Sequence, residues 1–205
     1  MENRRVIIAS NNSGKINEMK DILSNIDAKV LSLEEIGLKE DIVEDGQTFF
    51  DNAFKKASFV NQIIKDWTVG DDSGLCIKIL NGEPGVFSAR WAGEKRDGGA
   101  LIEHALEKMK GIPSEKREAW FESCVVLFSP QGKCQAFSGK LHGKITESPR
   151  GEMRPRLPYD SIFVPDGSDQ TLAEMSLNKK NSLSHRGKAL SALKKFLKNN
   201  FYNDE

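Results

Sequence analysis

The stretch "RRVIIASNNSGKINEMKDILSNIDAKVLSL", residues 4–33, decides the fold class. It opens and closes with short apolar runs of the kind that is typical of β-strands. Between them, a turn signal precedes apolar residues at helical spacing, namely Ile16, Met19, Leu23 and Ile26. A strand, a helix and a second strand in this order predict a βαβ unit with two parallel strands.

Two further long helices are expected downstream. Residues 47–66 form an amphipathic pattern, and residues 185–199 form another with Ser184 as its N-cap. The mostly apolar face of the first of these helices is expected to contain Phe50, Ala53, Phe54, Ala57, Asn61 and Ile64. A shorter helix is expected over residues 98–111.

The remaining apolar segments are expected to be strands. Residues 67–80 suggest a strand, a break and a second strand, because two aspartates and a Ser-Gly pair interrupt the apolar run. Two long segments around a Pro-Gln-Gly turn predict an antiparallel hairpin, and residues 161–165 a short strand. We expect a single α/β domain over residues 1–205 with a mixed sheet, in which the hairpin, about residues 114–146, forms a smaller lobe.

Composition and charge exclude several classes of protein. Thirty basic and thirty acidic residues give zero formal charge over 205 residues, which argues against a protein whose main partner is nucleic acid. No apolar run is long enough to span a membrane or to form a signal peptide. Cys76, Cys124 and Cys134 lack the spacing of a zinc site and are expected to be buried free thiols. A cytoplasmic protein without a membrane partner is therefore predicted.

The loop "SNNSGK", residues 10–15, joins the first predicted strand to the first helix. Small residues at a helix start leave backbone N–H groups and the positive end of the helix dipole exposed, which suits a phosphate. Lys15 adds a cation, although the spacing of a P-loop is absent. The alternative is a loop that only caps the helix.

Two acidic segments are candidates for a metal site. Asp71 and Asp72 end an apolar run, and the ends of strands in α/β sheets are where ligand sites collect. Hard oxygen ligands at that place suit Mg²⁺. The alternative is a turn in which Asp72 and Ser73 bond to the backbone. Glu44 and its neighbour Asp45 precede the long helix, where carboxylates usually interact with the helix dipole.

The segment "KKNSLSHRGKAL", residues 179–190, places Lys180, His185, Arg186 and Lys188 around a helix start. Cations at this end of a helix oppose its dipole, so an anionic or polar ligand explains them better than a structural role. Together with the acidic segments and the loop, they favour nucleotide phosphate chemistry. The chain contains no GxSxG or HExxH motif.

Several segments, in the same order, resemble the inosine/xanthosine triphosphate pyrophosphatases, also called Ham1-like proteins. "SNNSGK" is similar to the family's Thr-Gly-Asn-x-Gly-Lys loop, and "VEDGQTFFDNAFKKA" to its Glu-x-Gly-x-Thr-Phe-x-x-Asn-Ala-x-x-Lys-Ala segment. "DDSGLCIKILNGEPGVFSARWAG" is similar to its Asp-Asp-Ser-Gly-Leu segment and the Pro-Gly-x-x-Ser-Ala-Arg run after it. "TLAEMS" and "KNSLSHRGKAL" match its C-terminal signature. The resemblance covers nearly the whole chain.

The resemblance implies Mg²⁺-dependent hydrolysis of a nucleoside triphosphate to the monophosphate and pyrophosphate. The preferred substrates would be ITP, dITP and XTP, and the biological role would be to keep deaminated purines out of DNA and RNA. The implied fold is an elongated mixed β-sheet flanked by helices, with two lobes and the active-site cleft between them. A homodimer is also implied.

The resemblance assigns phosphate and metal binding to particular residues. The loop that would hold the phosphates consists of Ser10, Asn11, Asn12, Ser13, Gly14 and Lys15. Glu44 and Asp72, together with Asp71, would hold Mg²⁺, and Ser73 would contact the substrate. Asp72 would also be the proton acceptor. Since one carboxylate cannot easily be both a tight ligand and a free base, the division of these tasks between Asp71 and Asp72 stays open.

Base recognition would belong to Lys180, His185 and Arg186, which the resemblance maps to the residues that read the 6-oxo group of the purine. A keto oxygen accepts hydrogen bonds from these donors, whereas the amino group of adenine would leave them unpaired.

The base loop departs from the family, whose loop reads Gly-Phe-Gly-Tyr-Asp-Pro. Leu157 replaces the stacking Phe and Pro158 replaces a Gly, while Tyr159 and Asp160 are kept. Loss of an aromatic stack removes about 1–3 kcal/mol of binding unless another group replaces it.

These departures leave alternatives to the implied activity. They are a pyrophosphatase with a shifted or broadened base preference, and a nucleotide-binding protein without catalysis. Arg154 or Arg156 is a candidate to cover the base in place of the missing aromatic ring, with a guanidinium laid on the purine face.

Overall fold

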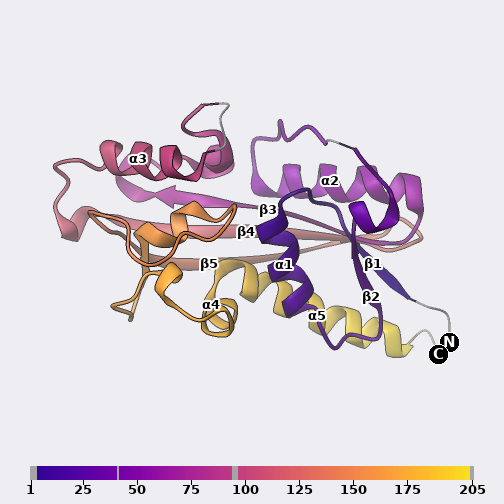
Figure 1. The fold of residues 1–205 in the computed structure, drawn as a ribbon. Helices are drawn as coiled ribbons and strands as arrows, with labels where there is room; N and C mark the ends of the chain where they lie inside the picture. The colour runs from indigo at the N-terminus through magenta and orange to yellow at the C-terminus, as the bar shows by residue number, and fades with distance from the viewer. Residues whose placement is uncertain (1–3, 41, 94–96, 204–205) are drawn as a thin grey trace.

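The computed structural model describes residues 4–40, 42–93 and 97–203. Among these residues, six strands form one sheet in the order β2-β1-β3-β4-β5-β6 (Figure 1). The strands are β1 (Arg5–Ile8), β2 (Lys29–Ser32), β3 (Trp67–Ile77), β4 (Glu118–Phe128), β5 (Cys134–Ile145) and β6 (Phe163–Pro165). β1 is parallel to β2 and β3, and each neighbouring pair from β3 to β6 is antiparallel. The mixed sheet and the opening βαβ unit are confirmed.

Five α-helices of the described residues cover the two faces of this sheet (Figure 1). They are α1 (Ser13–Ile22), α2 (Phe49–Ile64), α3 (Gly98–Lys108), α4 (Leu177–Leu183) and α5 (His185–Asn203). α2 packs on β3 and β4, whereas α5 packs on the other face of β4 and on β5. The hydroxyl of Ser184 accepts a hydrogen bond from the backbone N–H of Gly187, which is the expected N-cap of α5. None of the helices in these ranges is long and apolar enough to cross a membrane.

The two largest of the four hydrophobic clusters formed by the described residues mark the cores of two lobes. One core joins β1 to α1 and α5, and the other lies between the sheet, α3 and the 3-10 segment η5 (Pro158–Ile162). β4 contributes to both cores, with Val125 in the first and Phe121 in the second. The hairpin that was predicted to form the smaller lobe is therefore shared between the lobes, because its strands of 11 and 12 residues are long enough to cross both.

β3 continues through the predicted break. Residues 71–74 pair in register with residues 122–125 of β4. Because β4 supplies a partner for every residue of this run, the Ser-Gly pair does not turn. A continuous strand directs Asp71 and Asp72 to opposite faces of the sheet, which gives the two carboxylates different surroundings.

Two of the three cysteines are buried, as predicted, and one is not. Cys76 and Cys124 are buried free thiols, and burial raises their pKa values to about 12 and about 11. Cys134 is also free but exposed, because it begins β5 next to the hairpin turn.

The close approach of α2 to β3 depends on Gly70. A Cβ atom at Gly70 would overlap the carbonyl oxygen of Ala53 and lie 2.9 Å from the backbone nitrogen of Ala57. The small side chains of α2 therefore face the sheet. Phe50 and Phe54, predicted to be on the buried face, are 44% and 37% exposed, because the backbone contact leaves no room for them.

Gly70→Ala is expected to lower the free energy of unfolding by about 1–3 kcal/mol, because the added methyl group pushes α2 off the sheet. Chemical denaturation measures this change. The matched control is Gly99→Ala in the first turn of α3, where the nearest atom to an added Cβ is 3.6 Å away. The control is expected to keep or slightly raise stability. Equal losses in both variants would contradict the packing role of Gly70.

Candidate functional site

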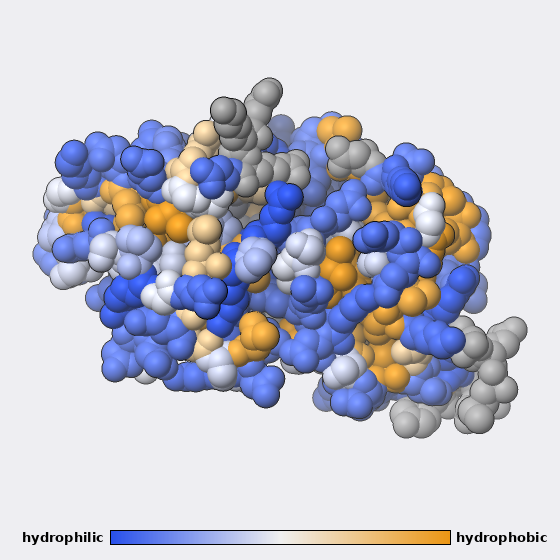
Figure 2. All heavy atoms as spheres, in the orientation of Figure 1, coloured by the Kyte–Doolittle hydropathy of each residue, from blue (hydrophilic) through white to orange (hydrophobic). Residues whose placement is uncertain are grey.

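A cavity of about 690 Å³ contains most of the predicted site residues, and its volume is typical of small-molecule sites. The predicted residues that line it are Ser10, Asn11, Asn12, Lys15, Glu44, Asp72, Ser73, Leu157, Pro158, Tyr159, Asp160, Lys180, His185 and Arg186. Ser13, Gly14 and Asp71 are not among the lining residues. Figure 2 shows strongly hydrophilic side chains across the middle of one face of the molecule, with apolar side chains on both sides of them. Segments from both ends of the chain thus meet at one site.

The loop before α1 is held by its own side chains and supplies a cation. The side-chain oxygen of Asn12 accepts a hydrogen bond of 3.1 Å from the backbone N–H of Lys15, which caps α1. The ammonium of Lys15 lies 2.9 Å from Oδ2 of Asp71 and 3.7 Å from Oδ1 of Asp72. Burial lowers the pKa of Lys15, but the attraction of the two carboxylates outweighs burial and raises it, so this side chain stays charged.

Asp71 is fully buried, and both of its oxygens are already bound. Its Oδ1 accepts from the hydroxyl of Ser123 at 2.7 Å, and its Oδ2 faces Lys15 and the Nε of Arg186 at 3.4 Å. Burial would raise the pKa of Asp71, but the two cations outweigh burial and hold it well below its usual range. The predicted role of Asp71 as a third metal ligand is not supported by this geometry, since alternation along β3 turns it away from the cavity.

Asp72 and Glu44 face the cavity and share one cation. The ammonium of Lys56 lies 3.2 Å from Oε1 of Glu44 and 3.9 Å from Oδ1 of Asp72. Burial raises the pKa of Asp72, although Lys15 and Lys56 oppose this shift. In the described part of the chain, no three acidic, histidine or cysteine side chains converge in a way that would hold a metal ion without other ligands. Two hard carboxylates around a single cation nevertheless match the donors that Mg²⁺ takes when phosphates and water complete its shell.

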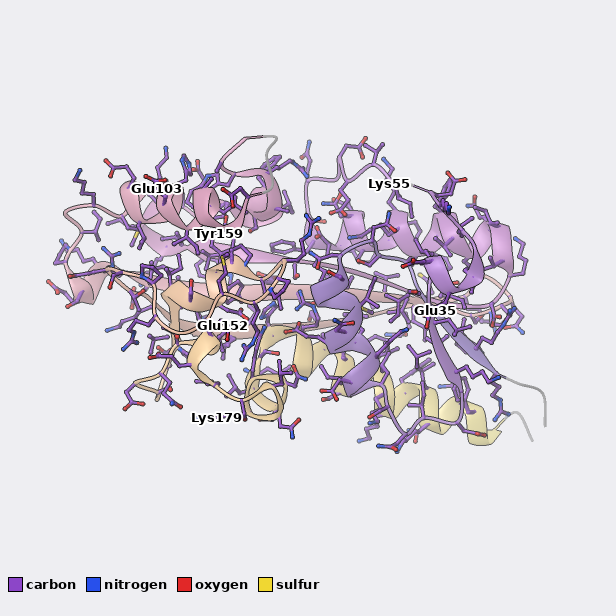
Figure 3. All side chains as sticks on the ribbon, in the orientation of Figure 1. Glu35, Lys55, Glu103, Glu152, Tyr159 and Lys179 are labelled. Atoms are coloured by element: carbon purple, nitrogen blue, oxygen red, sulfur yellow. The ribbon has the colours of Figure 1, made fainter. Side chains whose placement is uncertain are left out.

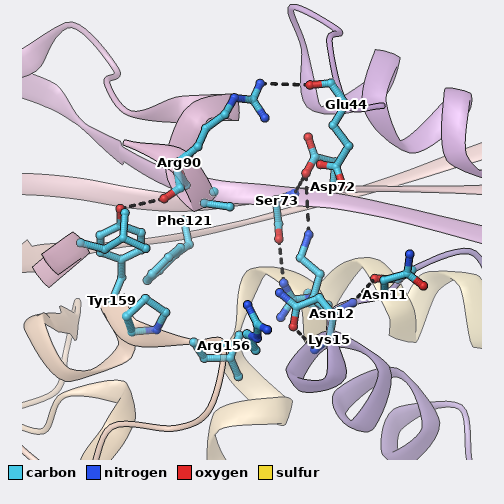
Figure 4. Close-up of a pocket in the computed structure, with 18 of the residues that line it drawn as sticks. Asn11, Asn12, Lys15, Glu44, Asp72, Ser73, Arg90, Phe121, Arg156 and Tyr159 are labelled. Carbon is cyan, nitrogen blue, oxygen red and sulfur yellow. Dashed lines mark hydrogen bonds and ion pairs between the residues drawn. The ribbon is translucent and has the colours of Figure 1, made fainter. Parts of the chain in front are cut away.

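Sequence reasoning missed the side chains that hold these carboxylates in place. Asn52 of α2 donates to Oδ2 of Asp72 at 2.9 Å and accepts from the backbone N–H of Gly46 at 2.8 Å. Arg90 donates to the backbone carbonyl of Glu44 at 3.0 Å (Figure 4). A polar residue that faces inward from a helix beside an acidic strand was the available signal for Asn52.

A third missed residue, Glu18, holds the predicted base-reading cations. Lys180 lies 2.5 Å from Oε1 of Glu18 and also pairs with Asp160, while Arg186 pairs with Oε2 of Glu18. Burial would raise the pKa of Glu18, but Arg186 and Lys180 outweigh burial and lower it. Lys180 and Arg186 are only 1% and 3% exposed, so both are fixed ion-pair partners before any ligand binds.

His185 differs from these cations because it is neutral. Its ring is stacked on Phe121, another cavity residue, with 4.8 Å between ring centroids and 12° between planes. Burial, followed by the repulsion of Arg186, lowers the pKa of His185 well below its usual value. Its Nδ1 is buried and has no hydrogen-bond partner among the described residues. A polar ligand atom in the cavity would satisfy this nitrogen.

The base loop is anchored on both sides of the cavity. The hydroxyl of Tyr159 donates to the backbone carbonyl of Ser88 at 2.8 Å, and Figure 3 shows this side chain between the sheet and α3. Arg154 donates to the carbonyls of Leu172 and Met175 and lies 3.5 Å from Asp160. These bonds hold Arg154 at the wall of the cavity.

Basic side chains outnumber carboxylates in and around the cavity. The basic side chains in its lining are Lys15, Lys56, Arg90, Arg154, Arg156, Lys180 and Arg186. The carboxylates in or directly behind the lining are those of Glu18, Glu44, Asp71, Asp72 and Asp160. Within the described ranges, each of these basic side chains pairs with one of the carboxylates except Arg90 and Arg156. The cavity is therefore positive before a ligand enters.

The fold and the site define a two-lobed α/β protein with an ionic cavity between its lobes. The chain belongs to the Ham1 family, whose profile matches residues 6–196. It is 45% identical to a dITP/XTP pyrophosphatase of Leuconostoc mesenteroides, over 94% of this chain and 96% of that protein. It is 43% identical to the dITP/XTP pyrophosphatase of Bacillus subtilis, over 95% of this chain and 97% of that protein.

A solved structure shows the same fold. The Ham1 protein of Staphylococcus aureus superposes with a TM-score of 0.84 at 36% identity, over 96% of this chain and all of that one. The predicted family and the predicted fold class, including the elongated mixed sheet, are thus confirmed.

Glu18→Gln is expected to lower the free energy of unfolding at neutral pH by about 3 kcal/mol. This value is the lower end of the range for breaking a buried ion pair, because Asp160 still faces Lys180 and Asp71 still faces Arg186 in the variant. Since the pKa of Glu18 is lowered in the folded state, its contribution is present above its ordinary pKa of 4.5 and is lost as the pH falls further. The difference between wild type and variant should therefore shrink in acid.

Denaturation at pH 7 and in acid measures this pair of effects. The control is Glu34→Gln, an exposed carboxylate whose replacement is expected to change stability by less than about 0.5 kcal/mol. A loss for Glu18→Gln no larger than that of the control would show that the buried network does not stabilise the fold.

Proposed function

We propose that this protein is a dITP/XTP pyrophosphatase, which hydrolyses deaminated purine nucleoside triphosphates to the monophosphate and pyrophosphate. The observation that carries the proposal is one cavity that contains a phosphate-suited helix start, the Glu44–Asp72 pair and the neutral His185. The names of the relatives from Leuconostoc mesenteroides and Bacillus subtilis support the choice of substrate. Removal of deaminated purines from the nucleotide pool in the cytoplasm is the role that we propose.

Mg²⁺ is proposed as the cofactor, held by Glu44 and Asp72. The ion would neutralise phosphate oxygens and increase the acidity of a bound water. Asp72 is proposed to accept the proton of the attacking water. A raised pKa makes this carboxylate a stronger base, and Asn52 fixes its orientation.

The phosphates are proposed to bind at the loop of residues 10–15. Backbone N–H groups at the start of α1 and the charged Lys15 favour an anion there. Lys15 is held by Asp71 and Lys56 by Glu44, so both cations are already oriented toward the site before substrate binds. The hydroxyl of Ser73 accepts a hydrogen bond of 2.7 Å from Arg186, and Ser73 lines the cavity beside these charged side chains.

Base selection is proposed to depend on His185. With its proton on Nδ1, the neutral ring would donate one hydrogen bond from this unpaired buried nitrogen to a 6-oxo group, whereas a 6-amino group would place one N–H donor against another. Lys180 and Arg186 support this ring electrostatically, since their own hydrogen-bonding groups are bound by Glu18, Asp160 and Asp71.

A shifted or broader base preference is the second candidate. The observation that favours it is the base loop, where Leu157 and Pro158 offer no aromatic ring for stacking. Phe121 lines the cavity, but its face is stacked on His185. The substrate panel below separates the two candidates.

Pyrophosphate release should be measured with dITP, ITP, XTP, ATP, GTP and dUTP in the presence of Mg²⁺. We expect kcat/KM for dITP and XTP to exceed that for ATP by about 100-fold or more, because an unpaired buried donor opposes adenine. Asp72→Asn should lower kcat by about 100-fold to 10,000-fold and keep nucleotide binding, as is usual for loss of a general base.

Asp45→Asn is the control, since Asp45 pairs with exposed Lys55 outside the cavity lining, and its turnover should match wild type. Absence of turnover on every nucleotide would refute the enzyme. A preference for dUTP or GTP would favour the second candidate.

A homodimer is also proposed. α2 exposes two pairs of apolar side chains, Phe50 with Phe54 and Phe59 with Ile63, on the two edges of its buried face, and exposed apolar side chains of this size mark candidate contact surfaces. Light scattering should give twice the monomer mass, and Phe50→Ser with Phe54→Ser should shift the protein toward the monomer. A monomeric wild type at micromolar concentration would refute the dimer.

A further inference from the structure

Arg156 is the basic side chain of the cavity whose role nothing above explains. It lines the cavity, is exposed, and has no hydrogen bond or ion pair with any residue that the structure describes. Its neighbour Arg154, in contrast, is held by Asp160 and two carbonyls. A guanidinium that faces a cavity without a partner is available for a ligand.

The charge distribution indicates an anionic ligand. Lys15, Lys56 and Arg186 are each neutralised by a carboxylate in or behind the lining, so they contribute little free positive charge. Arg90 bonds to a backbone carbonyl and lies over the ring of Phe87. Arg156 is therefore the unpaired charge with freedom to move toward a multiply charged ligand, and a guanidinium binds phosphate oxygens in a bidentate manner.

Arg156 lies near the loop of residues 10–15, where the phosphates of the nucleotide are proposed to bind. Residues 154–157 form a tight turn, closed by a 3.1 Å hydrogen bond from the backbone N–H of Leu157 to the carbonyl of Arg154. This turn packs against the first turn of α1, because a Cβ at Gly14 would lie 2.8 Å from the carbonyl oxygen of Pro155 and 3.1 Å from Leu157. Figure 4 shows Arg156 on the same side of the cavity as Asn12 and Lys15.

The backbone of Arg156 is strained. Its φ of 62° lies in the left-handed region, which a residue with a Cβ adopts at a free-energy cost and glycine adopts freely. Strained residues of this kind cluster at functional sites.

We infer that Arg156 binds the polyphosphate of the nucleotide together with the loop of residues 10–15. This inference rests on the proposed function for the identity of the full substrate. The part of the base loop that differs from the family would then contact phosphate. Base recognition would belong to the side of the cavity that contains His185 and Tyr159.

Two variants separate the side chain from the backbone. Arg156→Gly removes the charge and suits the positive φ, so its melting temperature should equal or exceed that of wild type. Arg156→Gln removes the charge and keeps the strain. Arg150→Gln, an exposed arginine outside the cavity lining, is the electrostatic control.

Calorimetry should be done with three probes: inorganic tripolyphosphate with Mg²⁺, deoxyinosine, and the two together. We expect both Arg156 variants to weaken tripolyphosphate binding by about 10-fold to 100-fold, as for loss of a charge-assisted hydrogen bond, and to leave deoxyinosine binding unchanged. The KM for dITP should rise by a similar factor with little change in kcat. The control should bind both probes as wild type does.

Several results would overturn the inference. These are unchanged tripolyphosphate binding in both variants, no tripolyphosphate binding by wild type, or weaker deoxyinosine binding with tripolyphosphate unaffected, which would place the guanidinium over the base. If the protein hydrolyses no nucleotide but the variants still weaken tripolyphosphate binding, the proposed activity fails and the phosphate role of Arg156 stands.

Discussion

The buried carboxylate of Glu18 is the constraint on which the site depends. It faces Lys180 and Arg186, two cations that are almost fully withdrawn from water. A buried cation without a partner is strongly unfavourable, so α1 must dock where α4 ends and α5 begins. This docking brings the N-terminal loop, near residue 12, and the C-terminal signature to the same cavity. The ionic network thus fixes the relative position of the two ends of the chain.

The same network explains why two adjacent aspartates act differently. Asp71 continues the network, since it faces Lys15, Arg186 and Ser123 behind the cavity. Asp72 points to the other side of the strand, toward Asn52 and the cavity. A strand without a break is the physical cause, because alternation places one carboxylate in the structure and the other at the site.

Most of the basic side chains of the cavity are paired with carboxylates before a ligand enters. Four carboxylates, those of Glu18, Glu44, Asp71 and Asp160, hold five of the basic side chains in place. A divalent cation at Glu44 and Asp72, the cofactor proposed above, would add positive charge close to Lys56.

The sequence by itself determined the βαβ opening, a long helix within residues 47–66, the long hairpin and the family, because hydrophobic periodicity and local motifs are readable from neighbouring residues. It also indicated Lys15, Glu44, Asp72 and His185, which the structure brings to one cavity.

Only the tertiary structure decided the features that depend on contacts between residues distant in the sequence. Pairing with β4 removed the predicted break in β3, and contact at Gly70 turned Phe50 and Phe54 outward. Glu18 pairs with Arg186 and Asn52 with Asp72, residues that are distant in the sequence. Such pairs form because buried charges and amides need partners, and only the folded chain brings the partners together.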